Sequence, residues 1–299
     1  MRALSILLLT LLMLGGCVIQ VDSLDYQNNV SDYEIKKIVK EVLSSQNDIN
    51  RAGIITSDGL QNLQRTHQSR DYFSNRYTCQ DNGYATIRFE GSDFSLTFSS
   101  GDSFGIEYSD CSFIAPYYDE NRINGTISFD IYQNMQDYQS TLLNFNVNYA
   151  DTHFYTNNSD IYFDGSLGVH YDFDNPTENL NITFSTNYLS IENNHFYQKD
   201  TFNDVVLDFH LDTLTLQYRY NYSGSLYNSY LGRLSFSTIE PMQGYKDHNP
   251  SSGIFKITNK YIQILVIPQD DYYVDLIVKN RYQPYQNHTI HTTWINIGL

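Results

Sequence analysis

The residues with the clearest potential for chemistry are a group of oxygen-bearing side chains in the middle of the 299-residue chain. Asp172, Asp174, Asn175 and Glu178 place several hard oxygen ligands in one short segment, and calcium prefers ligands of this type. The segment lacks the glycine and the spacing of an EF-hand loop. Its simpler interpretation is a solvated hairpin turn closed by Asn175-Pro176, and we favour that interpretation over a calcium site.

The eight histidines do not form a second candidate metal site. His288 and His291 are three residues apart, a spacing that puts two side chains on one face of a helix, but the surrounding sequence is typical of an extended chain. The sequence also contains no zinc-ligand set, serine-hydrolase elbow, phosphate-binding loop or dinucleotide fingerprint. We therefore predict no cofactor, no metal and no catalytic residue.

Composition restricts the kinds of partner. The net charge is −16, and the sequence has no basic stripe, so the chain is not expected to bind nucleic acid, whose phosphates require clustered Lys and Arg. Tyrosine is unusually common, with 27 residues, and Tyr218, Tyr220 and Tyr222 fall on one face of a predicted strand. Tyrosine packs well between strands and also lines ligand surfaces. We favour packing and keep a ligand surface as the alternative.

The N-terminus predicts where the protein is located. Arg2 precedes a short apolar run that ends in Leu14-Gly-Gly-Cys17, which is typical of a secretory signal and too short to span a membrane. This ending resembles the lipobox of bacterial membrane lipoproteins. The resemblance implies that residues 1–16 are a signal peptide and that Cys17 is acylated, as with palmitate. It further implies anchoring in the bacterial cell envelope, and Val18 implies the outer membrane, with periplasmic or surface exposure left open.

Two cysteines remain once Cys17 is assigned to the lipid. In an oxidising compartment Cys79 and Cys111 are expected to form a disulfide that closes a loop of about 33 residues. On the chain-entropy model such a bond stabilises the fold by roughly 3–4 kcal/mol. Two buried free thiols are the alternative.

The chain then divides into a short helical region and a long region of strands. Residues 17–30 show no periodicity and form the predicted lipidated tether. Ser31-Asp-Tyr-Glu34 is a capping box, and apolar residues at helical spacing from Ile35 to Leu43 predict a helix of about 13 residues. A second short helix is expected to open at Ser57 or Asp58. The N-terminal helical segment is therefore placed at 31–70.

From about residue 77 onward, apolar and polar residues alternate with a period of two, as in half-buried strands. We expect a dozen or more strands, most of them five to eight residues long, in one antiparallel β domain over 71–299. A mainly β meander of this size must close as a curled sheet, an open barrel or a sandwich, with the N-terminal α-helix against it. The predicted turns are Asn82-Gly83, Gly91-Ser-Asp93, Asn124-Gly125, Asp164-Gly165, Ser223-Gly224 and Ser251-Ser-Gly253.

The C-terminal third carries a second resemblance. Its short motifs resemble a pattern in uncharacterised proteobacterial lipoproteins, which implies a shared β fold and no known activity. Asn280-Arg-Tyr-Gln-Pro284 stands where that pattern has an Asp/Gly-rich turn, so no cation-binding role is carried over. The motifs are Gly232-Arg-Leu-Ser-Phe-Ser-Thr238, Pro241, Pro250-Ser-Ser-Gly253-Ile-Phe-Lys-Ile257, Val274-Asp-Leu276 and Thr293-Trp294.

Three classes of function follow from the sequence. The first is an envelope lipoprotein anchored through Cys17, with a non-catalytic binding or scaffolding role toward a protein partner. The second is a carrier that shelters an apolar ligand inside the curled sheet, with the helix as a lid. The third is a carboxylate-dependent hydrolase, because Asp and Glu number 34, although no spacing selects a catalytic pair. We prefer the first class. An open apolar cavity would favour the carrier, and converging carboxylates would favour the hydrolase.

Overall fold

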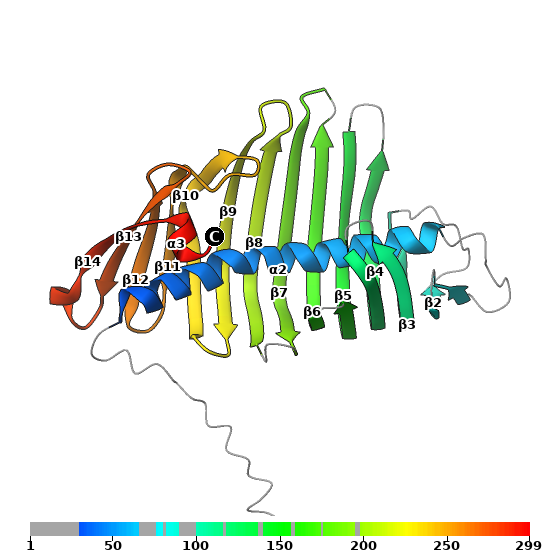
Figure 1. Cartoon of the computed structure of the whole chain (residues 1–299). Helices are drawn as coiled ribbons and strands as arrows, with labels where there is room; N and C mark the ends of the chain where they lie inside the picture. The colour runs from blue at the N-terminus through cyan, green and yellow to red at the C-terminus, as the bar shows by residue number, and fades with distance from the viewer. Residues whose placement is uncertain are drawn as a thin grey trace, which may run out of the picture.

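The structure, a computed structural model, describes residues 30–65, 76–79, 82–89, 100–115, 118–136, 140–156, 159–174, 176–194 and 198–299. In this part of the chain, one long helix lies against a fourteen-stranded antiparallel sheet, and a short helix ends the chain (Figure 1). Cys17, the signal peptide, most of the predicted tether and the turn at Gly91-Ser-Asp93 lie outside the described residues. No described helix has the length and hydropathy needed to cross a membrane.

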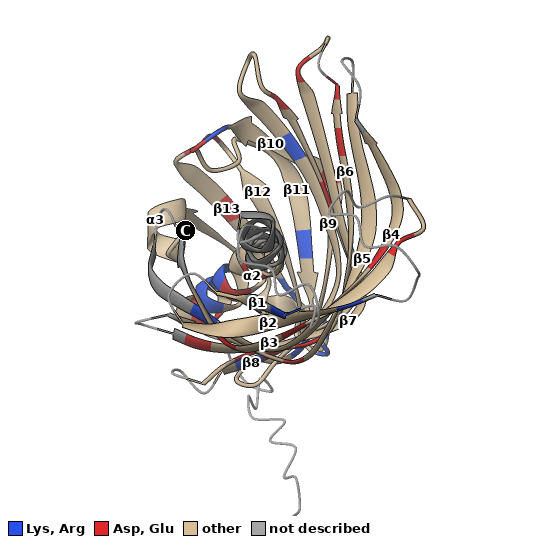
Figure 2. Cartoon of the chain, turned by 90° about the vertical axis from the view of Figure 1, so that its right-hand side faces the viewer, with Lys and Arg blue, Asp and Glu red and all other residues tan. Residues whose placement is uncertain are grey.

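Every strand pairs with the next strand in chain order, so the predicted antiparallel meander is confirmed. The sheet is an open, curled one, because in the described part of the chain no pairing joins β1 to β14. Figure 2 shows the sheet curled around the long helix α2. The elements are α2 (Asp32–Arg65), β1 (Arg76–Thr78), β2 (Asn82–Phe89), β3 (Ser103–Ala115), β4 (Tyr118–Gln136), β5 (Ser140–Thr156), β6 (Ser159–Asp174), β7 (Asn179–Asn193), β8 (Gln198–Asp212), β9 (Gln217–Asn228), β10 (Gly232–Tyr245), β11 (Ser252–Thr258), β12 (Ile262–Pro268), β13 (Tyr273–Asn280), η2 (Pro284–Gln286), β14 (His288–Thr293) and α3 (Trp294–Ile297).

Helix α2 begins at the predicted capping box. The Ser31 N–H donates to Glu34 Oε2 at 2.8 Å, and the Glu34 N–H donates to Ser31 Oγ at 3.3 Å. The predicted length was wrong, because α2 runs unbroken to Arg65 and includes the segment expected to form a second helix. Its buried stripe continues past Leu43 through Ser45, Ile49 and Ala52. Ser45 and Ala52 are not large apolar residues. The spacing of large apolar residues therefore does not predict this part of the buried stripe.

The alternation of the strands places the apolar side chains on the inner face of the curl, as predicted. On β2, Ala85 and Ile87 are buried, whereas Thr86 is half-buried and Arg88 is exposed. The largest fully buried side chains include Phe129, Phe163, Phe202 and Trp294, and the buried residues of α2 belong to the same core cluster. The helix therefore occupies the inside of the sheet and shares its core.

Five of the six predicted turns were wrong, and the sixth, at Gly91, lies outside the described residues. Five of these glycines lie inside strands at positive φ, beside register shifts that mark β-bulges. The strands are correspondingly longer than expected, with 19 residues in β4 and 17 in β5. Bulges bend a strand and increase its twist, so a series of them across the sheet accounts for its curl. The five are Gly83, Gly125, Gly165, Gly224 and Gly253.

Gly125 shows why these sites require glycine. Its φ is +110°, and a Cβ built on it would lie 2.0 Å from the carbonyl oxygen of Asp151 on β5. Asp151 itself has a φ of 47°, so both strands depart from extended geometry at the same level. The extra residue lies on β5, so Gly125 stands opposite the bulge, and an Asn-Gly pair provides positive φ there as well as it does in a turn.

The predicted disulfide is present. Cys79 follows β1 and bonds to Cys111 on β3, with 5.4 Å between the two Cα atoms and a sequence separation of 32. Both residues are buried. The bond therefore ties the first short strand of the sheet to the third.

Candidate functional site: an apolar trough between the helix and the sheet

The inner face of β5 to β9 carries more apolar surface than α2 covers. Three rows of aligned side chains cross these strands, and we call this surface the trough. In the order given in the next sentence, the rows become less buried. The first row contains the fully buried Tyr222, and every side chain of the third row is half-buried. The rows are Phe145, Val169, Phe184, Leu207 and Tyr222; Leu143, Tyr171, Ile182, Phe209 and Tyr220; and Phe173, Leu180, Leu211 and Tyr218.

A pocket of about 290 Å³ opens where the trough meets α2. This volume lies close to the lower end of the range for ligand sites, which is about 300–1,000 Å³. Gln46 and Asn47 of the helix form one side, and six apolar or aromatic residues of β7, β8 and β9 form the rest. None of the described residues that line the pocket carries a charge. The six sheet residues are Ile182, Phe184, Leu207, Phe209, Tyr218 and Tyr220.

Three tyrosines of β9 connect this surface to its surroundings. The Tyr222 hydroxyl shares a hydrogen bond of 2.9 Å with Ser45 Oγ of α2, and Tyr220 is hydrogen-bonded to the Gln46 side chain. Burial raises the pKa of Tyr220 to about 12 and raises the pKa of Tyr222 further. Both phenols are therefore neutral at physiological pH. The predicted common face is correct: Tyr222 packs in the core, whereas Tyr220 and Tyr218 line the pocket.

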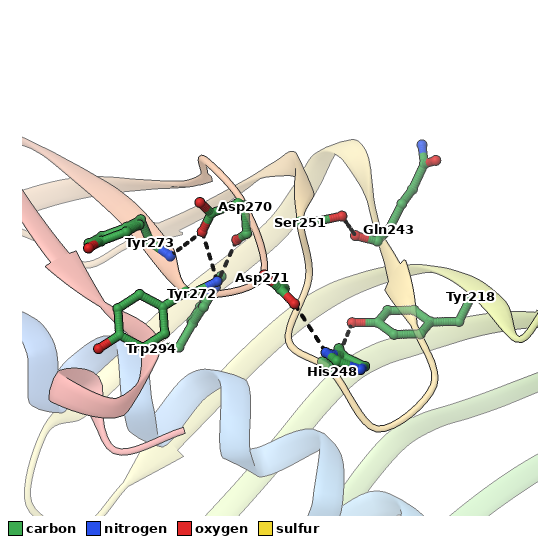
Figure 3. A network of polar contacts seen from close by, with 9 residues as sticks. All are labelled: Tyr218, Gln243, His248, Ser251, Asp270, Asp271, Tyr272, Tyr273 and Trp294. Atoms are coloured by element: carbon green, nitrogen blue, oxygen red, sulfur yellow. Dashed lines mark hydrogen bonds and ion pairs between the residues drawn. The ribbon is translucent and has the colours of Figure 1, made fainter.

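The β10–β11 connection borders the trough at Tyr218, as Figure 3 shows. The Tyr218 hydroxyl donates to the carbonyl oxygen of His248 at 3.0 Å. The His248 ring in turn pairs with Asp271 of the β12–β13 turn, with 3.1 Å between Nδ1 and Oδ2. The neighbouring carbonyl of Asp270 accepts a hydrogen bond from Trp294 Nε1 at 3.4 Å. Two loops and the C-terminal helix thus support one end of the trough.

A buried polar group fixes α2 to the sheet away from the trough. Asp200 of β8 accepts hydrogen bonds from Asn228 at 2.7 Å and from Gln198 at 2.9 Å. Gln198 also donates to Glu41 of the helix at 3.2 Å. Burial raises the pKa of the Asp200 carboxyl, against the effect of these hydrogen bonds. No motif in the sequence singled out this group, because Glu41 and Asn228 lie far in the chain from Gln198 and Asp200.

The candidate calcium segment forms hydrogen bonds within its own hairpin and with the neighbouring β8–β9 turn. Asp172 and Asp174 lie on β6, and Asp174 accepts a hydrogen bond from Thr177. The carbonyl of Glu178 accepts a hydrogen bond from the Thr213 hydroxyl at 2.7 Å, while Asn175 lies outside the described residues. Among the residues that the structure describes, no three His, Cys, Asp or Glu side chains are grouped as metal ligands.

The two histidines near the C-terminus point to different partners. Both lie on β14, and the predicted extended conformation is confirmed. His288 Nε2 is 3.2 Å from Asp32 of α2, whereas His291 Nδ1 is 2.6 Å from Asp275 of β13. An odd spacing on a strand puts side chains on opposite faces, so the two rings do not converge.

These observations place the apolar trough, with its pocket against Gln46 and Asn47, as the candidate site. The resemblances noted in the sequence stay predictions. Comparison of the chain with protein-family models, with curated proteins and with solved structures finds no significant match.

Proposed function

We propose that this protein binds the hydrocarbon chain of an uncharged single-chain lipid in the trough. In this proposal the protein acts at the bacterial cell envelope, where a lipid on Cys17 anchors it. The observation that carries the proposal is the apolar pocket between α2 and β7 to β9. Its position at the edge of the helix makes it continuous with the half-buried rows of the trough.

The shape of the trough suits an elongated ligand. Its rows run across the strands from β5 to β9, which is also the direction of α2 (Figure 1). Four spacings of about 4.8 Å give it a length of about 19 Å. Each methylene group that such a surface removes from water contributes about 0.8 kcal/mol. A chain lying beside the helix would therefore gain affinity with every carbon that fits.

The lining argues for a ligand without charge. Gln46, Asn47 and the two tyrosines of the pocket provide neutral hydrogen-bonding groups, and the described lining contains no Lys or Arg to pair with an anion. The net charge of −16 opposes anionic head groups as well. A hydroxyl or ester head group meets these conditions better than a carboxylate or phosphate does.

The same lining weighs against the hydrolase alternative, because none of the described pocket residues is Asp or Glu. A scaffolding role is supported by the filled core beneath α2, where Ile35, Ile38 and Val42 are almost fully buried. We rank it second because a filled core is expected of any stable domain and does not select a function.

The experiment measures binding of the uncharged fluorescent probe N-phenyl-1-naphthylamine to the mature chain carrying Cys17→Ser, which removes the predicted lipid. Displacement by dodecanol is expected. Ile182→Asn places an amide in the trough and should weaken binding about tenfold or more, whereas Thr183→Asn, on the other face of the same strand, should leave it unchanged. Folded protein that does not bind the probe, or equal binding in both variants, would contradict the proposal and leave scaffolding first.

A further inference from the structure

Tyr218 occupies the end of the trough on β9. Its cross-strand partner on β10 is Gly244. A Cβ built on Gly244 would lie 2.6 Å from the Tyr218 hydroxyl oxygen and 2.8 Å from Cζ. These distances are shorter than van der Waals contact, so the phenol ring uses the space that any side chain at residue 244 would need. The glycine therefore allows the ring to lie over β10.

Two further contacts hold the ring in this position. Its hydroxyl donates to the His248 carbonyl oxygen at 3.0 Å, and its ring stacks against Phe209 with centroids 6.1 Å apart. Behind it lies the polar network of the β10–β11 connection, in which His248 pairs with Asp271 (Figure 3). The third row of the trough thus stops at Tyr218, where a polar region begins, whereas in the second row Tyr220 pairs with the fully buried Met242 of β10.

We infer that Tyr218, positioned by Gly244, is the end wall of the trough and sets the length of the hydrocarbon chain that the protein accepts. This inference rests on the proposed function, because it concerns the same site and names what limits its ligand. The third row, which is the most open one, continues from β9 through β8 and β7 to β6, and at β9 the ring of Tyr218 closes it. A chain whose end reaches the ring fits, and a longer chain meets the phenol.

The test measures displacement of N-phenyl-1-naphthylamine by a series of saturated fatty alcohols from octanol to hexadecanol. For the wild-type sequence with Cys17→Ser, affinity should rise about fourfold per added methylene and then stop rising. Tyr218→Ala should move this limit to longer alcohols. Gly244→Ala should move it to shorter ones, because the new methyl group pushes the ring into the trough.

Tyr218→Phe is the matched control, since it keeps the ring and removes only the hydrogen bond to His248. Its length limit should stay clearly below that of Tyr218→Ala, because the space at Gly244 and the stacking against Phe209 still hold the ring. Circular dichroism of each variant establishes folding, and if Gly244→Ala does not fold, the comparison of Tyr218→Ala with Tyr218→Phe decides alone. A merely structural role of Tyr218 would weaken all alcohols equally and would not move the limit.

The outcomes separate this inference from the proposal on which it rests. If the wild-type trough binds alcohols but Tyr218→Ala shows the same limit, Tyr218 is not the end wall and the proposed function stands. If no alcohol displaces the probe from folded wild-type protein, the proposed function fails and the end wall fails with it.

Discussion

Replacing Gly125 with alanine should destabilise the protein much more than replacing Gly232 with alanine. Both glycines have positive φ, +110° at Gly125 and +73° at Gly232, so an alanine is strained at either position. They differ in their surroundings. A Cβ at Gly232 meets nothing within 4 Å, whereas a Cβ at Gly125 lies 2.0 Å from the Asp151 carbonyl oxygen and 2.7 Å from Thr152 Cα.

The two costs can be estimated separately. The backbone conformation alone costs about 1–2 kcal/mol for an L-residue, and this is the whole effect expected at Gly232. At Gly125, strands β4 and β5 must also move apart, and overpacking of this kind adds about 1–3 kcal/mol. We therefore expect a loss of about 3–5 kcal/mol for Gly125→Ala, once the ladder hydrogen bonds disturbed beside the bulge are included.

Urea unfolding of both variants measures the difference. Far-ultraviolet circular dichroism follows the whole sheet, and fluorescence of the single tryptophan, Trp294, follows the C-terminal end. The difference between the two free energies of unfolding is the decisive quantity, because the backbone cost is common to both. Equal losses, or a larger loss for Gly232→Ala, would show that the close approach of β4 and β5 at the bulge does not constrain the sheet.

Four other predictions concern the disulfide, the strand register, the buried Asp200 and the mobility of α2. Replacing Cys79 and Cys111 with serine should lower the free energy of unfolding by about 3–4 kcal/mol, measured in urea without reductant, and an unchanged midpoint would count against the disulfide. Ile87→Asp should cost several kcal/mol because it buries an unpaired charge, while Thr86→Asn should change stability by less than about 0.5 kcal/mol; the reverse order would mean an inverted strand register. Because burial raises the folded-state pKa of Asp200, its stabilising contribution is complete below the unfolded pKa and is lost as pH rises through the folded pKa. Asp200→Asn should therefore show a flatter decline of stability across that window than the wild type, in urea midpoints taken at several pH values. In hydrogen exchange, the amides of the buried half of α2 should be as protected as those of β8, both with and without a fatty alcohol. Fast exchange in α2 that the alcohol slows would instead identify the helix as a lid.

The strands could be predicted from the sequence because each has one face in the core, and such faces produce a period of two. The bulges could not be separated from turns by Asn-Gly pairs alone. A second signal was present in the bulged strands. Tyr108 and Cys111 on β3, and Phe202 and Val205 on β8, are buried although they are three residues apart. An odd spacing between inward residues indicates one extra residue inside a continuing strand.

The candidate site could be predicted only in part. The common face of Tyr218 and Tyr220 followed from their even spacing on one strand. Gln46 lines the pocket because of where α2 lies on the sheet. Gly244 lies beside Tyr218 because of the register between β9 and β10. Both are long-range pairings, and residue types within one segment contain no information about them.

The trough itself follows from a mismatch of dimensions. Strands β4 to β8 contain 15 to 19 residues, so at about 3.3 Å per residue they are about 50–60 Å long. Helix α2 lies across them and, with its side chains, is only about 10–12 Å wide (Figure 1). The apolar alternation nevertheless continues beyond the helix to Phe173, Leu180 and Leu211. Contiguous apolar surface that a fold leaves partly open is usually a binding surface. A hydrocarbon chain lying parallel to α2 would extend the inner layer that the helix begins.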